Sequence, residues 1–520
     1  MTLRCGLGAP SGPWEQLLLQ EGFPYGRVDF SRRFDADDWS VIAVTAPPSA
    51  EEAARLRAYL EGGGALIGAA AYLEPVTGVP CRRERVRYLT GEPDGAAREI
   101  LLCDIDAEAA IPREADTART DTGSDALFAG LWRGGAVAAL PFDPAAAMMD
   151  LRSARRQFHD SRDRLPWERV SRVAKGEVRL LVHAMLEYLH HARGLPYAHL
   201  WWFPGTAENV FAFRIDTDRG TPQQIDALHD LAREHELRMS WFLDVGSHEA
   251  WLHRFAAMPD QEIGVHCWRH RTTGRWEEDL ANIRQALRLL EPHAGRPAGF
   301  AGPFGVWNTG LATAIDAAGF DYSSEFSFAF DGLPFFPETG GHRYRALQVP
   351  IHPVCIGSLA RAGYREAEMR RYFDTVIARK LLRAEPLFFY HHPTHLRWDV
   401  LRAVFRTAQR LGVPFLSLGE YARWWRARLA LDVAFAAGGG AIALAPRGGA
   451  SPDPGLFGVR VARPDGTWRL SPAEEEVALA AGPWRPRNVV PPPPDLRRAR
   501  EADLRFALGA LFDTIANRRP

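Results

Sequence analysis

The chain has 520 residues, with 63 Lys and Arg against 64 Asp and Glu and a formal net charge of −1, a balance that argues against nucleic acid as a partner. Five scattered cysteines without a Cys-x-x-Cys motif argue against a disulfide framework, and the most apolar run, residues 429–445, is a poor membrane span because it contains Asp432 and three consecutive glycines. The N-terminus shows no apolar stretch after a basic start, so we expect a cytoplasmic protein with about three domains.

Residues 1–165 are predicted to form a doubly wound α/β domain. The region contains short apolar runs typical of buried strands, at residues 41–45, 65–69 and 137–140. Ser49 is expected to begin a helix that ends at Glu61, because Glu52 stands at the third helical position, as in a capping box, and three glycines follow. This glycine run either ends the helix or holds a phosphate.

The same stretch resembles a known family. The run Leu-Glu-Gly-Gly-Gly-Ala-Leu-Ile at residues 60–67 is similar to class I glutamine amidotransferase-like domains. In that family a nucleophilic cysteine lies at a sharp turn between a strand and a helix. The corresponding stretch here, Gly68–Tyr72, contains no cysteine. We therefore expect a non-catalytic domain that serves substrate handling or assembly.

Residues 166–205 are predicted to connect this domain to the next. Apolar residues recur at helical spacing over 167–193, which predicts one amphipathic linker helix. Four aromatic residues follow it, Tyr197, Trp201, Trp202 and Phe203. Such side chains either pack between domains or stack on sugar rings.

Between residues 206 and 430, short apolar runs alternate with helical patterns. The runs predict strands at residues 210–218, 237–244, 262–265, 346–351, 387–390 and 414–418. The helical patterns cover residues 222–236, 272–291, 366–384 and 397–411. This alternation predicts parallel strands joined by crossover helices, and we expect an α/β fold in the form of a distorted (β/α) barrel. Functional side chains of such folds gather at the carboxyl ends of the strands.

Two of these strands end in side chains that can bind a metal. Alternation along residues 210–218 places Asp216 and Asp218 on one face at the carboxyl end. The strand Glu-Ile-Gly-Val leads into His266, and His270 follows one helical turn later, so both imidazoles can point to one spot. Two histidines and one carboxylate are a common ligand set for catalytic zinc, and the second carboxylate can act as a base on water.

Each of these residues also has an ordinary structural explanation. The histidines fit two solvated imidazoles on a surface helix turn, and the aspartates fit a helix N-cap or a turn after a strand. Neighbouring carboxylates repel each other, however, so two of them at one strand end favour a bound cation. A metal site is therefore the preferred interpretation.

The order of the motifs resembles the polysaccharide deacetylase family, the NodB-homology or carbohydrate esterase family 4-like domain, over residues 206–425. The set comprises Asp-x-Asp at a strand end, His-x-x-x-His, Gly-Phe-x-x-Pro-Phe-Gly at 299–305, and a late apolar strand that ends in His. The resemblance implies that Asp216 is the base and that Asp218, His266 and His270 bind the metal. It also implies that His392 is the acid.

His391 and His392 are adjacent candidates for the acid. Alternation sends them to opposite faces of the strand, and both faces of a parallel strand are buried, so apolarity does not choose between them. In the family the His directly before Pro is the acid, which marks His392 and makes His391 a packed or supporting residue. His352 follows another apolar run and either contacts substrate or is structural.

The chain departs from the family pattern at three positions. Thr217 separates two acids that are usually adjacent, although alternation keeps both on one face. Cys267 stands where a Ser or Thr usually follows the first metal-binding His, and it either donates weakly or packs. The third departure is a missing arginine.

The motif Arg-x-Pro-Tyr/Phe reads Ala301-Gly-Pro303-Phe304, so the arginine that braces the catalytic carboxylate in the family is absent. Arg214 lies two residues before Asp216 on the same strand face. It either replaces the missing arginine or forms an ion pair without a catalytic role. Pro303 and Phe304 are expected to contact substrate, with a backbone N–H near Phe304 holding the oxyanion.

The resemblance implies a metal-dependent hydrolase, with Zn²⁺ or another divalent transition metal, that removes an N-acyl group from an amino sugar or glycan. The expected partner is a small-molecule or oligosaccharide substrate, and the expected acyl group is N-acetyl. Two other functions stay open, a non-enzymatic glycan-binding or scaffold protein and a hydrolase of a non-sugar amide.

Residues 431–520 are predicted to form a small β-rich module. A Pro-Asp-Gly turn separates the strand patterns 459–462 and 467–470. A spacer, Pro491–Pro494, then leads to an apolar helical pattern from Leu504 to Ile515, a candidate docking or oligomer helix. The sequence leaves the oligomeric state open.

Overall fold

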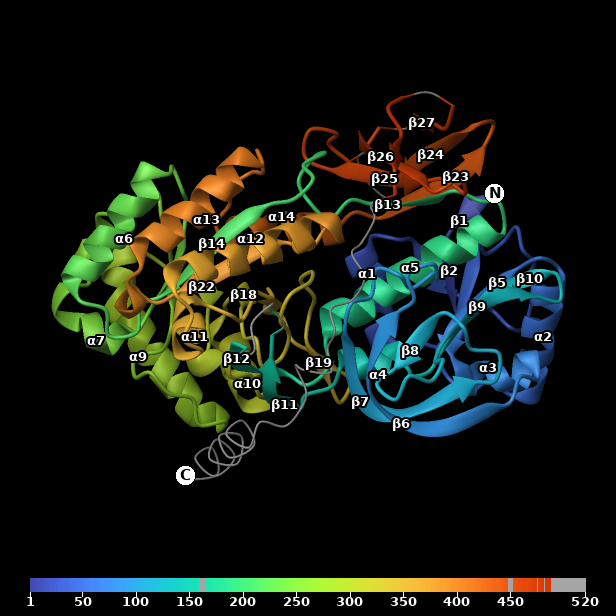
Figure 1. Cartoon of the computed structure of the whole chain (residues 1–520), viewed down its shortest axis with the longest axis horizontal. Coiled ribbons are helices and arrows are strands. Elements are labelled where there is room, and N and C mark those ends of the chain that lie inside the picture. The colour runs from blue at the N-terminus through green and yellow to red at the C-terminus, as the bar shows by residue number, and fades with distance from the viewer. Residues whose placement is uncertain (159, 161–164, 448–451, 475, 481, 488–520) are drawn as a thin grey trace. The chain divides into compact units, whose positions relative to one another are not determined.

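The computed structural model describes residues 1–158, 160, 165–447, 452–474, 476–480 and 482–487. These residues divide into two compact units that interleave along the chain. The first unit contains Met1–Met149, Val173–Ala207 and the described residues from Trp425 onward, and the second contains Asp150–Arg172 and Glu208–Trp424 (Figure 1). The spacer and the C-terminal helix predicted from the sequence lie outside the described residues. No described helix is long and apolar enough to cross a lipid bilayer.

The first unit is built on a six-stranded sheet with the strand order β3-β2-β4-β5-β10-β9. Its strands are β2 (Cys5–Leu7), β3 (Tyr25–Arg27), β4 (Val41–Val44), β5 (Ala65–Ala69), β9 (Phe128–Trp132) and β10 (Gly135–Leu140). All neighbouring pairs are parallel except β9 with β10. The three strands predicted in this region are therefore confirmed.

Five helices accompany this sheet, namely α1 (Gly12–Glu21), α2 (Ala50–Glu61), α3 (Ala70–Thr77), α4 (Pro144–Met148) and α5 (Lys175–Ala192). The predicted capping box of α2 is confirmed, since Glu52 N donates to Ser49 Oγ at 3.3 Å and Ser49 N donates to Glu52 Oε2 at 2.8 Å. Leu56 and Leu60 of α2 share one core with residues of α3, β4, β5 and β10. Apolar burial therefore fixes α2 and α3 against this sheet.

The remaining strands of the first unit form three antiparallel sheets, with the orders β7-β6-β8, β1-β23-β24-β27 and β13-β25-β26-β28. Their bounds are β1 (Thr2–Leu3), β6 (Cys81–Gly91), β7 (Cys103–Pro112), β8 (Ala118–Thr120), β13 (Tyr197–Leu200), β23 (Val433–Gly438), β24 (Ala441–Pro446), β25 (Gly458–Ala462), β26 (Thr467–Pro472), β27 (Glu476–Ala478) and β28 (Arg485–Pro486). The predicted hairpin is confirmed as β25 and β26. Because β23 pairs with β1 and β25 pairs with β13, the late strands complete sheets begun much earlier in the chain. The division into three domains and a connector predicted from the sequence stays a prediction.

The predicted linker helix over residues 167–193 is wrong at its start. Residues Trp167–Ser171 form β12, which pairs antiparallel with β11 (Ser153–Gln157), and α5 begins only at Lys175. Val170 and Val173 fit helical spacing, yet Val170 pairs with Ala154 across the hairpin. A long-range partner strand therefore overrides the local pattern.

The second unit is built on a sheet of seven parallel strands in the order β21-β18-β17-β16-β15-β14-β22. The strands are β14 (Phe211–Asp216), β15 (Ser240–Leu243), β16 (Glu262–Val265), β17 (Gly299–Phe300), β18 (Tyr322–Ser323), β21 (Leu347–Gln348) and β22 (Leu387–His391). His352 N, beyond β21, donates to Phe388 O of β22 at 2.8 Å, so the segment after one edge strand contacts the other edge strand. A half-barrel of parallel strands results.

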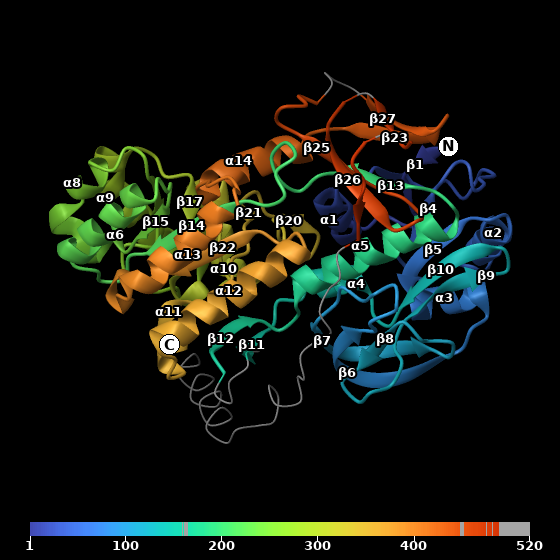
Figure 2. The ribbon, with the colours of Figure 1, turned by 45° about the horizontal axis from the view of Figure 1, so that its top comes forward.

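Helices follow most of these strands, as crossover connections require. They are α6 (Pro222–Glu234), α7 (Val245–His248), α8 (His253–Ala256), α9 (Trp276–Ala294), α10 (Thr309–Ala318), α11 (Ile356–Arg361), α12 (Glu366–Leu382), α13 (Trp398–Arg410) and α14 (Leu418–Leu429). A short hairpin of β19 (Glu338–Thr339) and β20 (His342–Arg343) lies between β18 and β21. Figure 2 shows α6, α9 and α13 outside β14 and β22.

Two predicted strands of this unit need correction. The run 237–244 is a strand only from Ser240, because the preceding residues complete the end of α6, where Glu236 has a φ of 52°. The run 414–418 forms no strand but a single bridge from Phe415 to Phe211, and α14 begins at Leu418. Leu237 and Met239 are buried outside the strand, whereas Phe415 and Leu416 are only partly buried.

Candidate metal centre

Three side chains converge where β14 and β16 end. Asp218 follows β14, His266 follows β16, and His270 lies four residues further on. His266 Nε2 lies 3.1 Å from His270 Nε2 and 3.3 Å from Asp218 Oδ1, and His270 Nε2 lies 3.2 Å from the same oxygen. The three ligand atoms thus form an almost equilateral triangle.

The two histidines converge by a different route from the one predicted. Residues 266–270 form no helix, and Cys267 adopts a left-handed conformation with a φ of 68°. This turn folds the chain back so that His270 faces His266. The Cys267 side chain is buried, and burial holds the pKa of its thiol well above the usual value, so of the two sequence-based alternatives packing fits it better.

Backbone contacts orient the first histidine. His266 Nδ1 lies 2.6 Å from Ala301 O, so Nδ1–H donates to this carbonyl and leaves the lone pair of Nε2 directed at the triangle. Ala301 is the position at which the family's arginine is missing, and here it contributes only its backbone. The ring of His270 lies against the exposed ring of Phe304, with 4.8 Å between centroids.

Arg214 and Asp216 form a buried pair beside this triangle. Arg214 is fully buried, and its Nε and Nη2 donate to Oδ1 and Oδ2 of Asp216, both at 2.6 Å, while Nη1 donates to Ser324 O at 2.5 Å. This planar fork fixes both oxygens of the carboxylate. Burial by itself would raise the pKa of Asp216, but the charges of Arg214 and His266 outweigh it and lower the pKa.

Thr217, between the two acids, holds the turn that separates them. Its Oγ1 accepts from Asp244 N at 3.0 Å, lies 2.8 Å from His248 Nε2 and reaches Phe242 O at 3.3 Å. The hydroxyl therefore ties the end of β14 to the end of β15 and to α7. The residue that interrupts the acid pair thus has a structural role of its own.

His392 completes the group from the end of β22. Its Nε2 lies 3.4 Å from Asp218 Oδ2, so His392 approaches the oxygen that the other two histidines leave open. Burial by itself would lower the pKa of His392, but a hydrogen bond and the charge of Cys355, together with the charges of Asp218 and Asp216, raise it to about 9. The imidazole is therefore held protonated at neutral pH.

His391 points the other way. It is fully buried, and neither ring nitrogen has a hydrogen-bond partner among the described residues. Burial, followed by the charges of His395 and His392, holds its pKa well below the usual value. Alternation along β22 thus brings His392, and not its neighbour, to the triangle.

His352 does not join this group. Its ring is fully buried, Nδ1 lies 3.2 Å from both carboxylate oxygens of Asp331, and Nε2 lies 3.0 Å from Tyr372 Oη. Both nitrogens are therefore engaged, and the structural alternative accounts for this residue. Pro303 is buried, whereas the neighbouring Phe304 is 69% exposed at a φ of 57° and remains available to a ligand.

Sequence reasoning missed two acidic or thiol groups near the site. Glu325, just after β18, accepts from Gly302 N at 2.9 Å, and burial raises its pKa to about 7. Cys355 lies beside His392 and His395, whose hydrogen bonds hold the pKa of the thiol well below its usual value although burial alone would raise it. The signal for Glu325 was a carboxylate directly after a strand, and Cys355 carried no recognisable motif.

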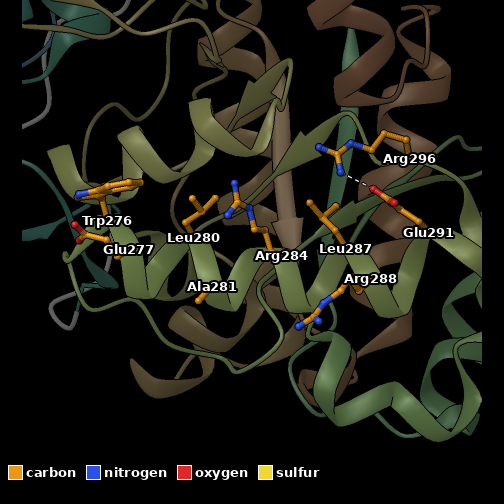
Figure 3. Close-up of a pocket in the computed structure, with 9 residues that line it drawn as sticks. All are labelled: Trp276, Glu277, Leu280, Ala281, Arg284, Leu287, Arg288, Glu291 and Arg296. Carbon is orange, nitrogen blue, oxygen red and sulfur yellow. Dashed lines mark hydrogen bonds and ion pairs between the residues drawn. The ribbon is translucent and has the colours of Figure 1, made fainter.

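A surface depression of about 630 Å³ lies along α9, lined by Trp276, Glu277, Leu280, Ala281, Arg284, Leu287, Arg288, Glu291 and Arg296 (Figure 3). Arg296 pairs with Glu291 at one end of it. The residues of the triangle do not line it, so this depression and the metal candidate are separate features.

No family model matches the chain, and no curated protein sequence matches it. Solved structures do resemble it. A peptidoglycan N-acetylglucosamine deacetylase covers 42% of this chain and 91% of its own, at 18% identity and a TM-score of 0.30. The allantoinase PuuE covers 43% and 92%, at 15% identity and a TM-score of 0.37. A carbohydrate esterase family 4 pseudoenzyme from Bacillus anthracis covers 42% and 68%, at 16% identity and a TM-score of 0.30.

Proposed function

We propose that this protein is a metal-dependent hydrolase that removes an N-acyl group from an amino sugar or glycan. The preferred acyl group is N-acetyl. The observation that carries the proposal is the triangle formed by Asp218 Oδ1, His266 Nε2 and His270 Nε2, with sides of 3.1–3.3 Å. Ligands about 2.0–2.1 Å from one ion lie about 2.9 Å apart at octahedral angles and about 3.4 Å apart at tetrahedral angles. The observed sides fall within this range, so the residues fit a divalent transition metal such as Zn²⁺.

The donor set supports this assignment chemically. The triangle joins a carboxylate with two imidazoles, a combination that suits zinc and related ions. Asp218 Oδ1 is buried, and the hydrogen bonds and charges of the histidines hold the pKa of this carboxyl well below its usual value against the effect of burial. When bound, the metal would supply Lewis-acid polarisation of the acyl carbonyl.

The remaining residues would supply proton transfer. Asp216 would accept a proton from the water that attacks the acyl carbon, while Arg214 holds both of its oxygens in place. His392, held protonated, would donate a proton to the nitrogen as the C–N bond breaks, so that a carboxylic acid and an amine leave. A general base and a general acid are the two proton-transfer groups that amide hydrolysis uses.

The sugar assignment rests on the rim of the site. Phe304 is exposed beside His270, and an exposed aromatic face next to a reacting centre is suited to stacking on a sugar ring. A backbone N–H near Phe304 would hold the developing oxyanion. The same base, acid and metal ligands would also hydrolyse a non-sugar amide, so substrate identity depends on this rim.

The proposal is tested by metal analysis combined with an acetate-release screen over chito-oligosaccharides and N-acetylated glycolipid precursors. We expect about one divalent ion per triangle and acetate release that disappears in His270→Ala together with this ion. Phe304→Ala should raise KM for sugar substrates more than it lowers kcat, because it removes a binding surface. Metal retention without turnover of any sugar or non-sugar amide would instead establish a binding or scaffold protein.

A further inference from the structure

A second group of soft ligands lies beside the triangle. Cys355 precedes α11, His392 follows β22, and His395 lies in the turn Pro393–His395. Each of them contributes one ligand atom, and these atoms lie within 4.8 Å of one another. Cys355 Sγ is 4.0 Å from His395 Nδ1, and the rings of His392 and His395 lie 4.7 Å apart between centroids. A thiol and two imidazoles thus face a common point.

The surrounding chain holds these side chains in place. A β-carbon added to Gly357 would lie 2.1 Å from the His395 ring, so α11 leaves room for this imidazole only because residue 357 is glycine. The chain after His395 turns through Leu396 and Arg397, with φ values of 51° and 67°. Ser358 Oγ lies 3.6 Å from Cys355 Sγ and offers a further oxygen. The group therefore has a defined shape and a fourth donor nearby.

We propose that Cys355, His392 and His395 form a second metal-binding site that takes a thiophilic ion such as Zn²⁺. With bond lengths of about 2.3 Å to sulfur and 2.0–2.1 Å to nitrogen, a tetrahedral ion places these two atoms about 3.6 Å apart. The 4.0 Å between Cys355 Sγ and His395 Nδ1 needs a contraction of only about 0.4 Å, within reach of side-chain rotation. A thiolate and two imidazoles are ligands that suit Zn²⁺ and copper ions, and their softness selects against Mg²⁺ and Ca²⁺.

The second site shares His392 with the chemistry proposed above. His392 Nε2 now faces Asp218, and Nδ1 is buried without a well-aligned hydrogen bond among the described residues. An ion on Nδ1 would prevent the ring from becoming an imidazolium, and an ion on Nε2 would take the lone pair that the transferable proton occupies. An ion at Cys355 would therefore inhibit hydrolysis, a consequence that rests on the proposed function, whereas the site itself does not.

Cobalt titration of the metal-free protein tests the site without relying on activity. We expect two equivalents to bind, one of them with thiolate-to-cobalt charge-transfer absorbance in the near ultraviolet. Cys355→Ser should abolish this absorbance and bind one equivalent. Cys81→Ser is the matched control, because it removes a thiol outside the group, and it should keep both. His270→Ala should keep the charge-transfer absorbance and lose only the other equivalent.

His395→Gln is a second variant, needed because Cys355→Ser could fail to fold. It should weaken cobalt binding at the thiolate at least about tenfold. The second site would be overturned by charge-transfer absorbance that persists in Cys355→Ser. It would also be overturned if the full chain bound a single equivalent of cobalt without such absorbance. If acetate release exists, excess Zn²⁺ should inhibit the full chain and not Cys355→Ser. Absence of acetate release would count against the proposed hydrolase alone, because the cobalt spectrum still decides the second site.

Discussion

Asp216 and Asp218 stand two residues apart, yet the structure gives them different electrostatic environments. Arg214 neutralises Asp216 through a two-pronged hydrogen bond, whereas Asp218 faces three imidazoles. Repulsion between the two acids is thus relieved by the guanidinium of Arg214 beside Asp216 and by the protonated imidazole of His392 beside Asp218. This division suits one carboxylate to proton transfer and the other to metal binding.

Arg214→Met should lower turnover about 10²-fold with the metal retained, because Asp216 loses the fork that positions it. Loss of this cation also raises the pKa of Asp216, so the acid limb of the pH–rate profile should move to higher pH. Metal content and pH–rate profiles measure both effects. Arg214→Lys keeps the charge without the fork and should recover the position of the acid limb but not the full rate. Unchanged turnover in Arg214→Met would show an ion pair without a catalytic role.

Glu325 should make stability depend on pH. Its pKa rises from 4.5 to about 7 in the folded chain because the carboxyl is buried, so the folded state keeps a proton that the unfolded state releases. The free energy of unfolding should therefore fall as pH rises from about 4.5 to about 7, by up to about 3 kcal/mol, and then level off. Glu325→Gln should remove this dependence, which melting curves across that pH range would show. An identical pH dependence in the variant would locate the titration elsewhere.

At the level of elements, the register of β22 decides which histidine can act. His391 and His392 are adjacent, but only His392 lies near Asp218. The turn after β16 decides in the same way where His270 lies, through the left-handed conformation of Cys267. Two local backbone features thus bring the candidate acid and the third candidate ligand to one place.

His392→Gln should cost on the order of 10²–10⁴ in turnover if proton donation to the amine limits the rate, whereas His391→Gln should be mild. Steady-state kinetics with the best acetylated substrate, at equal metal content, compare the two. The matched pair shares position and chemistry, so only the direction of the side chain differs. The reverse ranking would mean that the strand register is wrong by one residue.

Position 267 should matter for its backbone and not for its sulfur. Cys267→Gly should keep the metal, because glycine adopts a φ of 68° freely. Cys267→Val is β-branched and carries one more heavy atom, and strain of about 1–3 kcal/mol at this φ should weaken metal binding by about tenfold or more. Isothermal titration with Zn²⁺ measures the difference. Equal affinities in the two variants would refute the backbone explanation.

At the scale of the whole molecule, the chain passes repeatedly between the two units. The first unit takes α5 and β13 from the middle of the chain and the strands from β23 onward from its end. A chain that begins at Trp167 would contain these elements but would lack α1, β1 and β2. It would also lack β11, the strand that pairs with β12. The sequence predicts residues 1–165 as a separate, non-catalytic domain, so a chain that begins near Trp167 would keep the chemistry unless that domain shapes the pocket.

We now expect a chain truncated before Trp167 to be insoluble, because apolar residues of α5 such as Val178 and Leu186 are fully buried in the complete chain. Soluble expression and size-exclusion chromatography check this expectation. Soluble, active protein would show that the second unit folds and works without residues 1–166.

The complete chain should release no ammonia from glutamine, since the strand–helix turn from β5 to α3 contains no cysteine. An ammonia assay with the intact protein checks this, and release that survives in His270→Ala would assign glutaminase activity to the first unit.

The sequence by itself determined the strands that carry the candidate site and the residues at their ends. Period-two and helical patterns record which face of a local segment is buried, so β14, β16 and β22 were predictable, together with Asp218, His266 and His392. The fold class followed from the alternation of the two patterns. The roles of these residues and the identity of the metal stay predictions.

Only the tertiary structure decided which distant segments meet. The pairing of late strands with β1 and β13 and the approach of Cys355 to His395 join residues far apart in the chain. Local patterns cannot encode such contacts, because many long-range pairings bury the same apolar face. The left-handed turn at Cys267 belongs to the same class, since a non-glycine residue adopts that conformation only when its surroundings impose it.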